Sequence, residues 1–272
     1  MFDFFRNWRE RKTEAAFQKK VLRVLADALP HRKWHPGGHP EIILADGISC
    51  NLANLRATIK KLRSSKAEEK EMITRHVAAV LDSLTKLELD ELDWPQVRDK
   101  VRIQLTSESI LSSAPLAHVP LGGGLVKLAV VDSDVAFRYI SAEDLIRWRI
   151  NWDELEITAC SNLNEACQGR TQVSYVPGPD RLIAVQTLDG FDAARILIPD
   201  FRAFVASKLG SPFLFGVPNR DFLICWSHDN SESFLKLTRG RLQQDHKSQP
   251  YPISPEVFEA NRAQIAPWQP RN

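Results

Sequence analysis

The chain has 272 residues, 43% of them hydrophobic and 26% charged, and its 36 basic and 34 acidic residues leave a net charge of +2. This length is enough for one large domain or two small ones with a buried core. The near-neutral balance excludes a global field that would draw the chain to nucleic acid or acidic lipid, and no apolar run approaches the roughly 18 residues of a membrane span.

The first 12 residues, MFDFFRNWRERK, interleave aromatic and basic side chains. One interpretation is an anchor at a membrane interface. The other is an arm whose aromatics dock on the body, which the short length and the acidic Asp3 and Glu10 favour. A helix is predicted from Thr13 to Leu29, because apolar residues recur there with helical spacing.

Three histidines follow at intervals of four, at His31, His35 and His39. On a helix this spacing would align metal ligands, but the prolines and glycines of HRKWHPGGHP forbid a regular helix. A loop could still gather imidazoles around zinc. Since no acidic or thiol fourth ligand is near, the loop interpretation is favoured and no metal is assigned.

Turn and cap signals divide the rest of the chain. Asp46-Gly47 predicts a hairpin between 41–45 and 48–51, and Ser65 with Glu68 forms a capping box that opens a long helix. The run Gly122-Gly123-Gly124 could cradle a phosphate if a helix followed. A strand-like segment, LVKLAVV, follows instead, so a hairpin loop is predicted.

The second half alternates short strands with capped helices. Capped helices are predicted after Ser141 and Asn151, and strands at 171–175 and 182–187. From Asp189 to Trp226 the sequence predicts an acidic turn, a helix ended by Gly210, and two strands joined by the four-residue loop Pro218-Asn219-Arg220-Asp221.

These elements predict an α+β fold with a mainly antiparallel sheet, packed helices and a helix-rich N-terminal third. The predicted organisation is a helical region 1–97 with one hairpin, an α+β domain 98–265 and an irregular tail 266–272, with one continuous domain 13–265 as the alternative. The four cysteines form no CxxC pair, so free thiols in a reducing cytoplasm are expected.

Several segments resemble a bacterial family of uncharacterised proteins, the YtpQ-like family. The segments are YISAEDLIRWRINWDELEITACSNL, DGFDAARILIP, FLFGVPNRDFLICW and, more loosely, ILADGISCNLANL. The resemblance spans roughly residues 40–260. It implies a cytoplasmic bacterial protein with an α+β fold, and it implies no reaction, because the family has no known function.

The polar residues that could carry chemistry gather in the stretch from Asp189 to Trp226. The candidate ligand-binding residues are Asp189, Asp192, Arg195, Asn219, Arg220 and Asp221. One interpretation is a structural brace of arginine and carboxylate. The other is a recognition site in which the planar fork of Arg220 binds a carboxylate or phosphate, with Asn219 donating beside it.

The first functional hypothesis is a non-enzymatic binding or adaptor protein that recognises a protein partner or an anionic ligand near Arg220. The alternative is a metal-assisted hydrolase that uses clustered carboxylates, with Asp132 and Asp134 as candidate magnesium ligands. Binding to nucleic acid ranks third: the first 39 residues hold a local basic excess, but no reading motif. No nucleotide, serine-hydrolase or zinc-protease fingerprint is present, so no cofactor is expected.

Overall fold

The computed structural model describes residues 2–30, 33–36, 42–45, 48–52, 55–56, 59, 65–86, 92–112, 115–132, 137–249 and 251–269. The chain separates into two compact units, Met1–Lys86 and Leu87–Asn272, each of which is described by itself. The short helix α4 (Trp94–Val97), which the sequence analysis grouped with the N-terminal region, has its buried Val97 in the core of the second unit.

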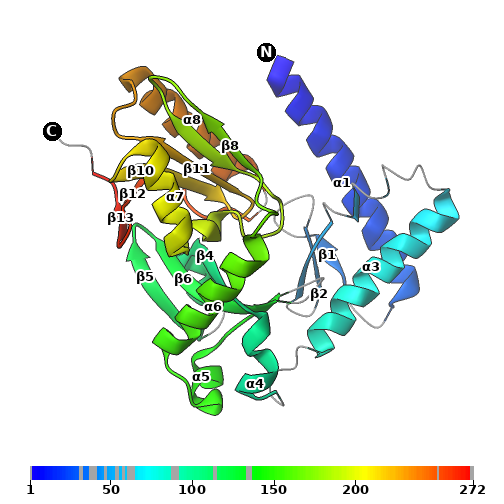
Figure 1. Cartoon of the computed structure of the whole chain (residues 1–272). Helices are drawn as coiled ribbons and strands as arrows, with labels where there is room; N and C mark the ends of the chain where they lie inside the picture. Colours follow the sequence, from blue (N-terminus) through cyan, green and yellow to red (C-terminus); the bar gives the residue numbers. More distant parts are fainter. Residues whose placement is uncertain are drawn as a thin grey trace. The chain divides into compact units, whose positions relative to one another are not determined.

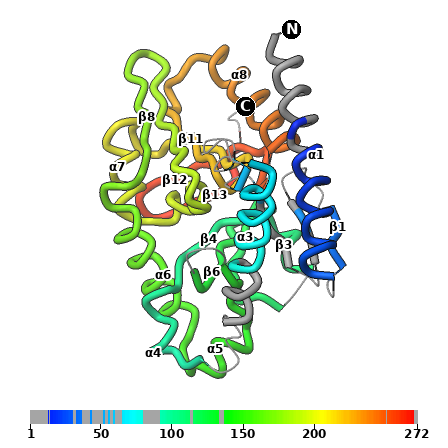
Figure 2. Tube along the Cα trace, turned by 90° about the vertical axis from the view of Figure 1, so that its right-hand side faces the viewer, coloured from blue at the N-terminus to red at the C-terminus, as the bar shows by residue number. Residues whose placement is uncertain are grey.

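In the described part of the first unit, the helices α1 (Phe2–Ala28) and α3 (Lys66–Lys86) pack with a small sheet (Figure 1). The strands of this sheet are β1 (His35–Pro36), β2 (Ile42–Ala45) and β3 (Ile48–Asn51). Figures 1 and 2 show α3 lying against α1, and an ion pair between Lys20 and Glu69 joins the two helices. Their apolar faces meet the strand β2 in one core cluster, formed by Val21, Leu25, Ile43, Leu52, Leu55, Ile73 and Val77.

The predicted hairpin and capping box of this unit are confirmed. Ala45 pairs with Ile48, as a two-residue hairpin loop requires. The Ser65 N–H donates to Glu68 Oε2 over 2.7 Å in the predicted capping box. The helix predicted from Thr13 instead begins at Phe2, so that α1 includes the aromatic-basic arm; the side chains before residue 13 lie outside the description.

The predicted histidine loop falls largely on residues that the structure does not describe. His31 and His39 lie outside the described residues, and His35 is exposed on β1. The metal interpretation of this loop therefore stays a hypothesis.

The second unit contains a four-stranded sheet in which β6 is the centre. Its strands are β4 (Val101–Ser107), β5 (His118–Gly122), β6 (Leu125–Asp132) and β7 (Phe137–Tyr139). β4 pairs along one edge of β6, while β5 and β7 share the other edge. The helix α6 (Trp152–Cys167), capped by Asn151, packs on β4, and α5 (Ala142–Trp148) begins at the predicted cap Ser141.

The glycine run is the hairpin loop between β5 and β6, as predicted, since Gly122 pairs with Leu125. All three glycines have positive φ, and a Cβ on Gly123 would lie 2.9 Å from a ring carbon of Phe258. The run is therefore needed for the tight turn and for close contact with the second sheet of this unit.

The second sheet has six strands in the order β13-β12-β10-β11-β9-β8. The strands are β8 (Val173–Val176), β9 (Leu182–Val185), β10 (Phe213–Asn219), β11 (Phe222–Ser227), β12 (Phe258–Ala260) and β13 (Ile265–Pro267). Three helical elements accompany them: the 3₁₀ segment η4 (Ala193–Leu197), α7 (Pro199–Leu209) and α8 (Glu232–Ser248). Every strand pairing among the described residues is antiparallel, which confirms the predicted α+β class.

Strand β10 is buried on both faces, which explains its nearly continuous apolar sequence. Leu214 points to one face, into a cluster with Trp226 and Leu242 beneath α8. Phe213 and Phe215 point to the other face, into the main core that η4, α7, α6 and the four-stranded sheet share. The acidic turn and the Arg220 loop lie at the ends of these buried elements.

Two details differ from the sequence analysis. The loop between β10 and β11 has two residues instead of four, because Asn219 pairs with Phe222 after an irregularity in the ladder beyond Gly216. The tail predicted to be irregular from residue 266 instead supplies Ala266 and Pro267 to the edge strand β13, which pairs with β12. Among the described helices, none is long and apolar enough to cross a membrane.

Candidate functional site

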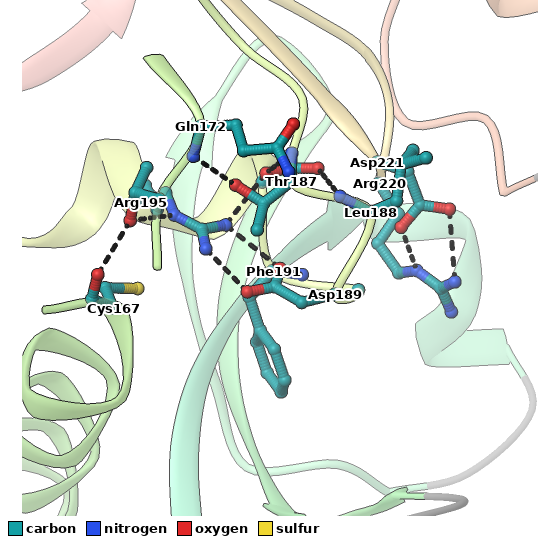
Figure 3. Close-up of polar contacts among 12 residues, drawn as sticks. Cys167, Gln172, Thr187, Leu188, Asp189, Phe191, Arg195, Arg220 and Asp221 are labelled. Carbon is teal, nitrogen blue, oxygen red and sulfur yellow. Dashed lines mark hydrogen bonds and ion pairs between the residues drawn. The ribbon is translucent and has the colours of Figure 1, made fainter. Parts of the chain in front are cut away.

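Arg195 is the centre of the acidic turn that follows β9. Its side chain is buried, and it donates from Nη1 to Asp189 Oδ1 over 3.0 Å and to Asp192 Oδ1 over 2.9 Å. A second bond to Asp189 runs from Nη2 over 2.5 Å, and Nε donates to Thr171 Oγ1 over 3.2 Å. Figure 3 shows this convergence, in which the turn, η4 and the segment before β8 meet on one guanidinium.

Asp192 is fully buried and is held by the backbone as well as by Arg195. Its carboxylate accepts from the N–H groups of Thr187 and Leu188, over 2.9 and 2.8 Å. Asp189 is more exposed, and it accepts the Phe191 N–H over 3.0 Å across its own turn. Because each of these charges has a partner of opposite sign within the cluster, Asp189, Asp192 and Arg195 form a closed ion-pair brace.

Arg220 lies on the other side of the same turn (Figure 3). Its Nε and Nη2 donate to the two carboxylate oxygens of Asp221, over 3.0 and 3.2 Å. Its guanidinium carbon lies 3.7 Å from the ring centroid of Tyr251 and 5.8 Å from that of Phe137. Its side chain is 19% exposed. The guanidinium is therefore held in place by a carboxylate along one edge and by an aromatic ring over its face.

The backbone of the loop that holds Arg220 is also hydrogen-bonded to neighbouring segments. The Arg220 N–H donates to the Tyr251 carbonyl, and its own carbonyl accepts from the Ala193 N–H, each over 3.0 Å. Asn219 is buried, and its Oδ1 accepts the Asp221 N–H over 3.0 Å. Asn219 thus stabilises the turn through its Oδ1, and a donor role of its amide group toward a ligand stays a prediction.

The aromatic and amide side chains that complete this region carry no local sequence signal for a site. Tyr251 and Phe137 come from segments far apart in the sequence. Gln104, buried in the apolar strand β4, donates to the Gly190 carbonyl over 2.9 Å and so anchors the acidic turn. In the sequence, Gln104 stands out only as an uncharged polar residue in the apolar segment VRIQL, which does not by itself indicate a site.

Tyr139 gives this region a measurable response to alkaline pH. Burial raises the pKa of its phenol to about 12, with Arg220 opposing the rise and Tyr251 adding to it. An unfolded tyrosine has a pKa of about 10. The contribution of Tyr139 to stability is therefore complete below about pH 10 and is lost as the pH rises to about 12.

We expect Tyr139→Phe to remove this loss, so that the free energy of unfolding falls less steeply between pH 10 and 12 than in the wild type. Urea titrations at intervals across this window measure the slope. Tyr175→Phe is the matched control, because Tyr175 is exposed on β8, and it should keep the wild-type slope. Equal slopes for Tyr139→Phe and the wild type would contradict the prediction.

The carboxylates proposed for a metal are only partly described. Asp132 ends β6 and pairs with Phe137 of β7, while Asp134 lies outside the described residues. Asp189 and Asp221 are ion-paired to Arg195 and Arg220. Within the described part of the chain, no three histidine, cysteine, aspartate or glutamate residues form a group that could hold a metal ion.

A scan of protein-family models, a search of curated proteins and a search of solved structures each found no match for this chain.

Proposed function

We propose that the chain is a non-enzymatic binding protein that recognises an anionic group, on a protein partner or a small ligand, through Arg220. The observation that carries this proposal is the unused edge of a guanidinium that is already held in place. Of its five N–H groups, one on Nε and one on Nη2 bind Asp221. Within the described residues, no acceptor contacts Nη1.

The free edge has the geometry that a carboxylate or a phosphate needs. Nη1 and the second N–H of Nη2 point in parallel away from the carbon, which allows a bidentate pair with two oxygens. The ring of Tyr251 covers the face of the guanidinium. The edge lies in the guanidinium plane, so the ring does not cover it. Since Asp221 and Tyr251 restrict the side chain before any ligand arrives, binding costs little rotamer entropy.

Binding is favoured over hydrolysis because the described aspartates of the acidic turn and the Arg220 loop are all engaged by arginines. A general base needs an acceptor atom within reach of the proton that it removes. Asp189, Asp192 and Asp221 each accept bonds from an arginine. The aspartates around the turn therefore support positioning of Arg195 and Arg220 more readily than proton transfer or metal binding.

We also propose membership in the YtpQ-like family, on the resemblance of three segments. In this fold those segments are junctions: β7 into α5 and α6, the acidic turn into η4, and β10 into β11. The proposed binding surface lies at two of the three. The family has no known activity. The resemblance therefore supports only the fold, and the proposed function depends on the geometry around Arg220.

The test uses succinate and inorganic phosphate as probes in thermal-shift titrations of the full chain. We expect a saturable rise in Tm for the wild type, none for Arg220→Ala and a reduced one for Arg220→Lys, which keeps the charge and loses the fork. Arg181→Ala is the matched control, because Arg181 pairs with Asp229 away from Arg220, and it should respond as the wild type does.

A variant of Asp221 distinguishes a ligand-binding role of Arg220 from a purely structural role. Asp221→Asn removes a negative charge beside the bound anion, and two unit charges about 4 Å apart in water interact by about 1 kcal/mol. We therefore expect Asp221→Asn to bind the probes about fivefold more tightly. No response of the wild type to either probe, or an equal response of Arg220→Ala, would overturn the proposal.

A further inference from the structure

A second site lies in the same unit, in a pocket that shares no residue with the Arg220 region. Its volume is about 670 Å³, and it opens between α6, the first turn of α7 and the strands β5, β6 and β13. The apolar part of its wall includes Leu121, Ile157, Leu197 and Ile265. Ile157 is 72% exposed, so a ligand in the pocket would remove apolar surface from water there.

The inner end of the pocket carries a buried cation, Arg202, that has no hydrogen bond or ion pair to a carboxylate among the described residues. Arg202 is 9% exposed, and its four hydrogen bonds all go to backbone carbonyls: Nη1 to Ile196 and Leu197, each over 2.9 Å, and Nε and Nη2 to Arg262 over 3.3 and 3.2 Å. These bonds satisfy donors without neutralising the charge, and one Nη2 N–H is left over. A buried charge without a counter-ion favours an anion beside it.

The first turn of α7 adds partial positive charge to the same wall. Leu197, Ile198 and Pro199 line the pocket at this helix end. Ile198 is the N-cap and provides no side-chain cap. The next two backbone N–H groups, of Asp200 and Phe201, have no hydrogen-bond partner in the described part of the chain. Uncapped N–H groups at a helix start attract negative charge.

The acidic residues of the pocket only partly offset this field. Glu156 acts on Arg202 through space and opposes the burial that lowers the Arg202 pKa, but its ion pair is with Lys127, and it also accepts from Trp152 Nε1 over 2.6 Å. Asp153 and Asp200 are exposed, so water and salt screen them, and Asp200 accepts from Asn164 over 3.0 Å. The charge that is least screened at the inner end is therefore that of Arg202.

We propose that this pocket binds a small amphipathic carboxylate, with its apolar body against Leu121, Ile157 and Ile265 and its carboxylate toward Arg202 and the first turn of α7. The bound carboxylate supplies the counter-charge that Arg202 lacks. The apolar body covers the exposed Ile157. This site is independent of the anion site at Arg220.

A cysteine in the pocket wall reports occupancy directly. Cys160 lines the pocket, whereas Cys167, two turns further along α6, does not. Burial raises the pKa of the Cys160 thiol to about 11, with Glu156 adding to the rise and Lys127 and Arg202 opposing it. The thiol therefore reacts slowly with N-ethylmaleimide, and a ligand beside it slows the reaction further.

The experiment titrates octanoate below its micelle concentration and follows N-ethylmaleimide labelling of the full chain by mass spectrometry. We expect octanoate to slow Cys160 labelling at least fivefold and to leave Cys167, on the same tryptic peptide, unchanged. Octanol and octylammonium, which have the same chain length and lack the negative charge, should protect less than twofold. Protection by these two as strong as that by octanoate would overturn the proposal, as would no protection at all.

Substitutions at exposed positions locate the site, because they should change ligand binding without unfolding the protein. Ile157→Glu, at an exposed position, should abolish protection, while Ile146→Glu, at a similarly exposed isoleucine on α5 that does not line the pocket, should keep it. Protection that survives Ile157→Glu would contradict the proposal. Arg220→Ala should leave protection intact, so failure of the two sites can be told apart.

Discussion

Replacing Arg195 by methionine is expected to lower the free energy of unfolding by about 3–5 kcal/mol, the usual cost of removing one partner from a buried ion pair. The substitution keeps much of the side-chain volume and leaves the buried Asp192 carboxylate without its counter-charge. Asp192→Ala should cost a similar amount, because it also removes the acceptor of the Thr187 and Leu188 N–H groups.

Asp189 provides the internal comparison for this brace. Its side chain is 38% exposed, whereas that of Asp192 is fully buried. Water can replace part of what Asp189 supplies, so Asp189→Asn should cost less than half of the Arg195→Met effect. Urea titration followed by tryptophan fluorescence measures all three variants. Equal costs for Asp189→Asn and Asp192→Ala would contradict the assignment of the buried pair as the main support.

Gly216→Val is expected to destabilise the second unit by about 1–3 kcal/mol or more, the range for overpacking a filled core. A Cβ built on Gly216 would lie 2.6 Å from both terminal carbons of Leu242 and 3.2 Å from its Cγ. Leu242 is 2% exposed and lies between α8 and β10, so it cannot turn away into solvent. The helix must therefore shift from the sheet.

A second substitution makes this prediction specific. Leu242→Ala removes the clashing atoms, and in the Gly216→Val background it should recover part of the lost stability, although alone it leaves a cavity and destabilises. The double-mutant cycle in urea measures the coupling. A double variant whose loss equals the sum of the two single losses would show that the contact between residues 216 and 242 is not the cause.

Local signals predicted the elements of this protein well, because their causes are local. The Ser141 and Asn151 caps, the Asp46-Gly47 hairpin and the triple-glycine loop each depend on backbone geometry within a few residues. The apolar run of β10 likewise predicted a strand, and the structure shows that this strand is buried on both faces. The predicted four-residue length of the following loop was wrong, because Asn219 pairs with Phe222 after an irregularity that no turn residue signals.

The candidate residues around the acidic turn show what could not be predicted from the sequence. The i, i+3 spacing of Asp192 and Arg195 is typical of a pair on a helix surface; the two side chains do pair, but they are buried. Whether Arg195 or Arg220 was buried could not be read from the sequence. The decisive neighbours, Thr171, Gln104 and Tyr251, reach the turn only through strand pairing and loop return.

The sequence by itself determined the α+β class and the stretch from Asp189 to Trp226 in which the two arginines lie, since hydrophobic period, caps and turns are properties of short segments. Tertiary structure alone decided that Arg195 is enclosed by two carboxylates, while the side-chain hydrogen bonds of Arg220 within the described part of the chain go to Asp221. It also placed Arg202 in a pocket wall where its hydrogen bonds to described residues go to backbone carbonyls. The physical reason is that burial and counter-charge come from residues distant in the chain, and they decide what a charged side chain can bind.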